Sequence, residues 1–212
     1  ARRACAFGVT AEVCLECGGR PPGGQRIVAH IGILPLHRRR PTRKNGGLLG
    51  LWSGFALLDI TIKIERPRVE ELFAPYRTLI GHDFDGYRNH VHRCITYAMH
   101  FLDNATQYEQ LVETAFVYHD IGLWTDQELA YLEPSEAVAL QDNERCGWGL
   151  DPDALRGAIH WHHKVFKYKG MHADVVEACR KADWIDATRG LCRKGMPRAF
   201  IAKVESTFPN LS

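Results

Sequence analysis

The chain has 212 residues, of which 45% are hydrophobic and 25% are charged, the composition of a soluble globular protein with room for one ordinary core. Its net charge is only +2, but residues 1–45 carry nine Lys or Arg and two Glu, a local charge of +7 that leaves −5 for residues 46–212. The body is therefore mildly acidic, which argues against a nucleic-acid-binding surface there.

The seven cysteines indicate reduced thiols rather than a disulfide framework, because their number is odd and they are scattered along a chain that can fold without covalent links. This favours a cytoplasmic location. Cys14 and Cys17 have the spacing of a zinc knuckle or a redox motif. The sequence holds no second pair with this spacing, so we interpret the two as incidental.

Residues 1–65 form an atypical N-terminal arm. Residues 1–45 are rich in Arg, Gly and Pro, a composition that buries too little apolar surface to order itself. The chain begins with Ala rather than Met, and one hypothesis is that the arm is an artefact of gene-start assignment or a fragment boundary. Residues 47–62 are apolar, but Asp59 interrupts them and they fall short of the ~20 residues that a membrane span needs.

From about residue 66 the apolar residues recur at helical intervals, and we place the main domain at residues 66–212. Pro67 begins a first helix that ends at Gly81. Asp85 caps a second helix that runs to about residue 102, and a third is expected from about residue 106 to Gly122.

The second half of the domain continues the helical pattern. A fourth helix contains Ser135 and ends near Gly147. Asp151 and Pro152 have the cap-plus-proline form of a fifth helix, which would carry residues 160–163. A sixth helix covers about residues 173–188, and a last one follows residue 197. The sequence therefore predicts an all-α bundle of six or seven helices.

Four clusters of imidazole and carboxylate groups lie in these predicted helices: around His90, at His119 and Asp120, at residues 160–163, and around Asp183. Nitrogen and oxygen donors of this kind suit divalent cations such as Zn, Fe, Mn, Ni or Co. The adjacent pair is the most informative, because it follows an apolar run. Burying such a pair is costly unless it is paired or binds a metal.

Each cluster also has a plain structural interpretation. A single histidine on an amphipathic helix, such as His90, is more often a surface or hydrogen-bonded core residue than a ligand, and His92 competes with it for any ligand role. Asp183 and Asp186 lie one helical turn apart, where they could act as ligand and supporting group or could face solvent.

Three imidazoles occur within four residues at positions 160–163. If the helix continues through them, His160 and His163 share a face and His162 points elsewhere. The four clusters taken together indicate one common metal site.

The order and form of these clusters resemble the HD-domain superfamily of metal-dependent phosphohydrolases, over about residues 85–190. His90, in His-x-x-Arg-Cys, matches the first histidine of that family. His119 and Asp120, in Tyr-His-Asp-Ile-Gly, match its signature pair, and Asp183, in Ala-Asp-Trp-Ile-Asp, matches its last aspartate. The resemblance implies that these four residues bind one divalent metal ion: Mn, Mg, Fe, Co, Ni or Zn.

Some branches of the family add histidines and bind two metals. Residues 159–163 resemble the His-His element of those branches, which makes His160 a candidate for contact with a second metal. However, Lys164 stands where a glutamate usually follows, the Gly-Tyr-Pro element is missing, and only Glu133 and Glu136 lie near the place of the middle histidine. These departures argue against cyclic-dinucleotide hydrolysis and leave a second metal open.

The resemblance implies hydrolysis of a nucleotide or another small phosphoester. The cation would lower the pKa of a bound water from about 15.7 toward 7. Asp120 would orient or deprotonate that water, and His162 or His163 would protonate the leaving oxygen as general acid. Lys164, with the lysines at 167 and 169, would contact phosphate or would belong to a solvated cationic loop.

Two other functions stay open. One is a different enzyme of the same kind, either a di-iron oxygenase, against which the missing middle histidine counts, or a hydratase of small nitriles. The other is a non-catalytic module that binds a nucleotide or a partner, against which the intact ligand set counts. We expect no nucleic-acid polymer and no membrane as partner, and we leave a homodimer open.

Overall fold

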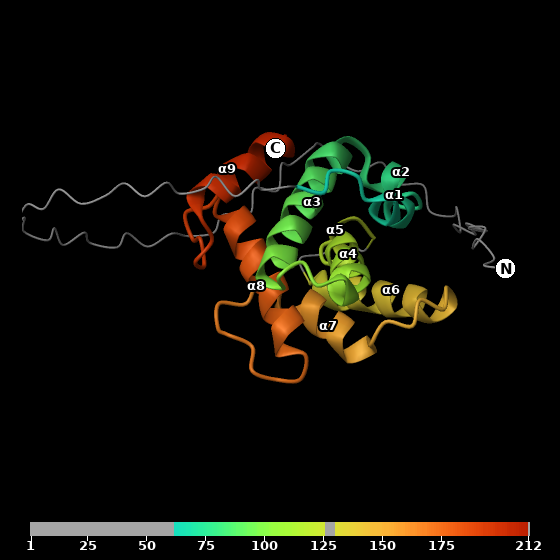
Figure 1. Cartoon of the computed structure of the whole chain (residues 1–212). Helices are drawn as coiled ribbons and strands as arrows, with labels where there is room; N and C mark the ends of the chain where they lie inside the picture. The colour runs from blue at the N-terminus through green and yellow to red at the C-terminus, as the bar shows by residue number, and fades with distance from the viewer. Residues whose placement is uncertain (1–61, 126–129, 212) are drawn as a thin grey trace, which may run out of the picture. The chain divides into compact units, whose positions relative to one another are not determined.

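The computed structural model describes residues 62–125 and 130–211, and within these ranges the chain is helical and contains no β-strand (Figure 1). Seven described helices have seven or more residues, which confirms the predicted all-α bundle. Their bounds are α1 (Pro67–Phe73), α3 (Phe84–Phe101), α4 (Glu109–Tyr118), α6 (Leu132–Arg145), α7 (Pro152–Trp161), α8 (Ala173–Ala187) and α9 (Arg198–Thr207). The shorter segments between them are α2 (Arg77–Ile80), α5 (Gly122–Thr125) and two 3-10 turns, Gly81–Asp83 and Thr106–Tyr108.

Most of the atypical arm, including Cys14 and Cys17, lies outside the described residues. Every described helix is either too short or too polar to cross a lipid bilayer.

The first part of the domain is more broken than its sequence indicates. Pro67 begins α1 as predicted, because its fixed φ suits a first turn and its missing N–H is not needed there. The helix that was expected to reach Gly81 is interrupted between α1 and α2. Gly81 does end α2, with a φ of 64° that favours glycine. Because α3 starts at Phe84, Asp85 lies in its first turn rather than at its cap, where its carboxylate still suits the helix dipole.

The core centres on α3 and α8, which lie against each other (Figure 1). Val91, Ile95 and Ala98 follow one face of α3 at helical spacing and are fully buried. Val176 and Cys179 of α8 are buried as well. Fully burying one Val or Ile side chain stabilises a fold by roughly 1.5–3 kcal/mol. Core packing therefore fixes the two helices to each other.

The start of α7 agrees with its sequence. The side chain of Asp151 accepts hydrogen bonds from the backbone N–H groups of Asp153 and Ala154, and Pro152 occupies the first turn. A cap of this kind stabilises a helix by about 1 kcal/mol. It also fixes where α7 begins, and thereby where His160, near the end of the same helix, lies.

α4, which precedes the His-Asp pair, is held by two buried polar contacts. Arg66 donates to Glu113 at 3.1 Å, and both side chains are only 4% exposed. At the end of the helix the hydroxyl of Tyr118 donates to Asp142 of α6 at 2.7 Å. Removing one partner of a buried ion pair costs about 3–5 kcal/mol, so the Arg66–Glu113 pair helps to hold α4 in place.

His92 is buried away from its neighbour His90 and does not compete with it. Its ring stacks on Phe208, with centroids 4.9 Å apart, and its Nε2 lies 3.3 Å from Oε1 of Glu70. Its Nδ1 has no hydrogen-bond partner. Burial disfavours the charged ring and lowers the pKa of His92 to about 4, in spite of the nearby carboxylate.

The stability of the fold should therefore depend on pH through His92. Because the pKa of His92 falls from 6.5 to about 4 on folding, the unfolded chain takes up the proton first as the pH drops. The contribution of His92 to the free energy of unfolding is present above pH 6.5 and is lost, by about 3 kcal/mol, as the pH falls to 4. We predict that the wild type is more stable relative to His92→Gln above pH 6.5 than at pH 4. The difference between their free energies of unfolding, measured by urea titration, should fall by about 3 kcal/mol between these two pH values.

His82→Gln, at a side chain that is 94% exposed, is the matched control for the loss of one imidazole. A difference between wild type and His92→Gln that does not change with pH would contradict the prediction.

Candidate metal centre

His119 and Asp120 lie in a turn that follows α4, so the prediction of a helix continuing to Gly122 is wrong at this end. Nδ1 of His119 lies 2.7 Å from the carbonyl oxygen of Phe116 and donates to it. The ring thus satisfies one of the carbonyls left free at a helix C-terminus. In the neutral ring the proton then belongs to Nδ1, so Nε2 keeps its lone pair and faces away from the helix.

His90 on α3 directs its Nε2 toward Nε2 of His119. Its Nδ1 lies 2.7 Å from Oδ2 of Asp186, and its Nε2 lies 3.0 Å from Nε2 of His119. Oδ1 of Asp183 on α8 lies 3.8 Å from Nε2 of His90 and 4.0 Å from Nε2 of His119. The packing of α3 on α8 therefore brings together groups that are more than ninety residues apart.

Asp120 adds a second carboxylate. Its Oδ2 lies 3.1 Å from Nε2 of His119, whereas its Oδ1 is buried and makes no hydrogen bond. Although burial disfavours charge, His119 and His162 hold the pKa of Asp120 well below its usual range. Burial raises the pKa of Asp183, against the influence of the three histidines near it. The two carboxylates thus differ in how readily they ionise.

The donor atoms of His90, His119 and Asp120 lie within 4.8 Å of one another, and so do those of His90, Cys94 and Asp183. The structure therefore gathers all four residues that the sequence singled out as a ligand set. Cys94, which the sequence did not single out, lies one turn after His90 with its Sγ 3.7 Å from Nδ1 of that ring. Burial raises the pKa of the Cys94 thiol, which keeps it protonated beside the cluster.

His162 points into the cluster, on the side of Asp120. The helix α7 ends at Trp161, so the positions after it do not follow helical spacing. Nδ1 of His162 donates to the carbonyl of Ile159 at 2.6 Å, and its Nε2 lies 3.4 Å from Oδ1 of Asp120. The ring is held by the same kind of bond, to a carbonyl three residues back, that holds His119.

His160 and His163 do not share a face, because only the first of them is in α7. Nδ1 of His160 lies 2.6 Å from Oε1 of Glu136 on α6. The half-buried ring of His163 has its Nδ1 3.1 Å from Nε2 of His162. Burial, together with His162 and Lys164, lowers the pKa of His163 to about 4. Lys164 lies at the start of the loop after α7, where its carbonyl accepts a hydrogen bond from the indole of Trp184 at 3.1 Å.

Two tyrosines that the sequence analysis missed flank the cluster. Tyr87 is buried, its ring centroid lies 6.1 Å from that of His90 and 5.9 Å from that of His119, and its hydroxyl donates to a backbone carbonyl of α4. The ring centroid of Tyr131 lies 6.5 Å from that of His162, and burial together with Asp120 raises the pKa of the Tyr131 phenol. Tyr87 had a detectable signal, because it is three residues before His90 on the same helix.

Gly122 allows the segment around Tyr131 to pass close to the His-Asp turn. A Cβ at position 122 would lie 2.3 Å from the carbonyl oxygen of Tyr131 and 3.0 Å from the hydroxyl of Ser135. That hydroxyl accepts a hydrogen bond from the Gly122 N–H at 2.9 Å. The glycine in the Tyr-His-Asp-Ile-Gly sequence is thus required by close approach of backbone.

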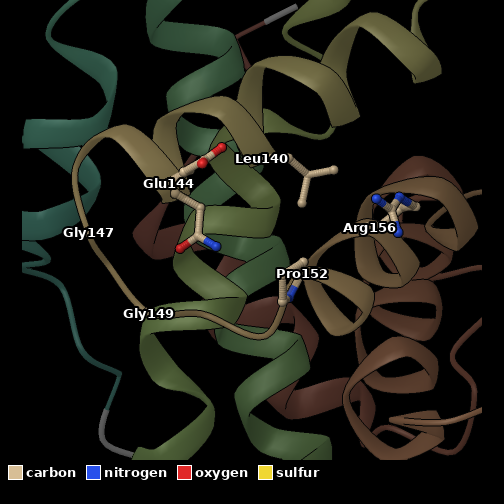
Figure 2. Close-up of a pocket in the computed structure, with 7 residues that line it drawn as sticks. Leu140, Glu144, Gly147, Gly149, Pro152 and Arg156 are labelled. Atoms are coloured by element: carbon tan, nitrogen blue, oxygen red, sulfur yellow. The ribbon is translucent and has the colours of Figure 1, made fainter.

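A groove of about 480 Å³ lies between α6 and α7, with Glu144 on one helix and Arg156 on the other (Figure 2). Its other lining residues are Leu140, Asn143, Gly147, Gly149 and Pro152. None of these belongs to the His/Asp cluster, so the groove and the candidate metal centre are separate features.

Comparison of the chain with protein-family models, with curated proteins and with solved structures finds no significant match.

We predict that Gly122→Ala lowers the free energy of unfolding by about 1–3 kcal/mol, because the added methyl group overpacks against backbone that cannot rotate away. Thermal and urea unfolding would measure the loss. Gly86→Ala is the matched control: position 86 is also helical, and nothing lies within 4 Å of a Cβ there. That substitution should stabilise the chain by about 0.5–1 kcal/mol. Equal effects of the two substitutions would show that the close approach at Gly122 is unimportant.

Proposed function

We propose that the chain is a metal-dependent hydrolase of the HD-domain type, and that it acts on a nucleotide or another small phosphoester. The observation that carries the proposal is the 3.0 Å separation of Nε2 of His90 from Nε2 of His119. Each ring has its Nδ1 held by an oxygen, of Asp186 in one case and of Phe116 in the other. Two acceptor nitrogens therefore face each other, which is unfavourable unless a cation or a proton lies between them.

The residues fit a divalent cation. His90 and His119 offer two imidazole nitrogens, and Asp120 and Asp183 offer carboxylate oxygens, a donor set suited to Mn, Fe, Co, Ni or Zn. Buried polar atoms are nearly always satisfied, yet Oδ1 of Asp120 is buried without a hydrogen bond. A cation held by these four residues would satisfy it.

The same geometry also favours a proton on His90. Burial opposes a charge on His90, but the hydrogen bond and the charge of Asp186 more than offset it and raise the pKa of His90. The protonated ring can then donate through Nε2 to His119. Metal binding would displace this proton, as is general for imidazole ligands.

The other side chains suit phosphoester hydrolysis. A bound divalent ion supplies a water of lowered pKa and neutralises a phosphoryl oxygen. Asp120, ionised and next to the histidine pair, is placed to orient the attacking water and to accept its proton. His162 contacts Asp120 and His163 contacts His162, so the two imidazoles form a chain from the cluster to the half-buried edge. We assign protonation of the leaving oxygen to His162, with His163 as its contact, because the low pKa of His163 leaves that ring neutral near pH 7.

Contact with substrate phosphate is assigned to Lys164, which directly follows these histidines and is half-buried at the start of the loop. Its backbone is fixed by Trp184, which limits where the ammonium group can reach. An ammonium near the leaving oxygen would attract the negative charge of the phosphate as a point charge.

A dinuclear iron site is the second candidate, because His162 approaches the free oxygen of Asp120 and would supply a further nitrogen donor on that side. It would turn the search from phosphoesters to oxygen-dependent substrates. The number of metal ions per chain distinguishes the two candidates, and it is measured by plasma mass spectrometry on protein purified without an affinity tag.

The test of the ligand set is metal binding together with phosphoester hydrolysis. His119→Ala and Asp120→Ala should abolish retention of Mn or Co and reduce hydrolysis of phosphoesters to background, while helical circular dichroism stays nearly intact. The reason is that each variant removes one of only four donors. His100→Gln, on the same helix as His90 but packed on Phe200, is the matched control and should retain both properties. Full activity in either cluster variant would overturn the assignment.

A further inference from the structure

Behind His90, on the side away from the cluster, lies a buried ion pair between α3 and α8. Arg93 donates through Nε to Oδ1 of Asp186 at 2.5 Å and through Nη2 to Oδ2 at 2.8 Å. The two side chains are 5% and 7% exposed. Oδ2 of Asp186 is also the atom that lies 2.7 Å from Nδ1 of His90. One carboxylate thus joins a bidentate guanidinium to a candidate metal ligand.

Each member of the ion pair lies three residues after a candidate ligand on the same helix. Arg93 follows His90 by three residues on α3, and Asp186 follows Asp183 by three residues on α8, so each helix offers one candidate ligand and one member of the pair on neighbouring turns. The same packing of α3 on α8 therefore brings both sets together.

Arg93 is itself fixed from a third element. Its Nη1 donates to the carbonyl of Phe208 at 2.9 Å, just after α9, and the amide of Asn89 donates to the carbonyl of Pro209 at 2.8 Å. The guanidinium is thereby held on two sides. The orientation of Asp186, and of His90 through it, is set by contacts that lie outside the cluster.

We propose that Asp186 and Arg93 are positioning residues for the metal centre, which hold the His90 ring with Nε2 directed at the metal. This inference rests on the proposed function, because it concerns the affinity of the same site. A carboxylate on the remote nitrogen of a metal-binding imidazole fixes its tautomer and its orientation, and loss of such a partner typically reduces metal affinity about 10- to 100-fold.

A merely structural ion pair makes a different prediction. If the pair only fastens α3 to α8, its loss destabilises the fold but leaves the affinity of the folded chain for metal unchanged. The chain holds a control pair of equal burial that lies within α8. Arg180 and Glu177 form a second ion pair on α8, again 5% and 7% exposed, with an Nε–Oε1 distance of 2.7 Å. Their contacts are with each other and with the loop after α7, not with His90.

The fold has room for substitutions of Asp186 and Arg93. A cavity of about 240 Å³ borders the pair and is lined by Arg93, Asp186, Arg189, Glu205 and Asn210. Asp186→Asn keeps the size of the side chain but removes its charge, and Arg93→Lys keeps the charge but loses the bidentate contact. The second variant provides the same test if the first fails to fold.

The experiment is titration of the full-length, chelator-stripped chain with Co(II) alone by calorimetry, beside thermal unfolding of each metal-free variant. Asp186→Asn should weaken Co(II) binding about 10- to 100-fold, and Arg93→Lys should weaken it by a smaller factor. Glu177→Gln should lower the unfolding temperature yet leave the Co(II) dissociation constant within about twofold of the wild-type value, since its partner does not touch a ligand.

Unchanged Co(II) affinity in both Asp186→Asn and Arg93→Lys would overturn the positioning role while leaving the proposed metal site intact. Equal weakening by Glu177→Gln would also overturn it, because a general loosening of α8 would then explain the effect. A wild-type chain that binds neither Co(II) nor Mn(II) would refute the proposed function itself, and the positioning role with it.

Discussion

The packing of α3 against α8 is the constraint on which the candidate site depends. The apolar face of α3, formed by Val91, Ile95 and Ala98, is fully buried, and this burial fixes the distance between the two helices. His90 lies on the flank of that face, so it cannot move without disturbing the core. Asp183 is buried on α8, the helix whose apolar residues Val176, Cys179 and Ala182 belong to the same core. The two helices hold the two halves of a charged site because their apolar faces pack against each other.

The three histidine rings of the cluster are oriented in the same way, because an oxygen atom holds the Nδ1 of each ring. In His119 and His162 the Nδ1 atom donates to the carbonyl three residues back, and in His90 it meets a carboxylate, so all three rings turn Nε2 inward. Such preorganisation has a cost in the absence of a cation, since lone pairs converge and one oxygen of Asp120 stays without a hydrogen bond. A cation that binds these lone pairs and the Asp120 oxygen would therefore stabilise the folded chain.

The helices and the four clusters of candidate ligands could be predicted from the sequence. The helix ends that position the site could not. The start of α7 was predictable because Asp151 and Pro152 satisfy the first turn from within the chain. The ends of α4 and α7 were not, because each is completed by a histidine ring that occupies the carbonyl a longer helix would have used. A histidine at such a position looks the same in sequence as one in the middle of a helix. For this reason the sequence predicted a shared face for His160 and His163, whereas His160 contacts Glu136 and His163 contacts His162.

The identity of a bound ion would follow from the same geometry. Two imidazole nitrogens and two carboxylates make a mixed donor set, and Mg prefers oxygen ligands with several retained waters. The thiol of Cys94, close to His90, is the softest donor nearby, but burial raises its pKa and opposes the thiolate form that metals require. The proposed centre therefore favours Mn, Fe, Co, Ni or Zn held by nitrogen and oxygen. The balance moves toward the softer Zn or Co only if the thiol loses its proton on metal binding.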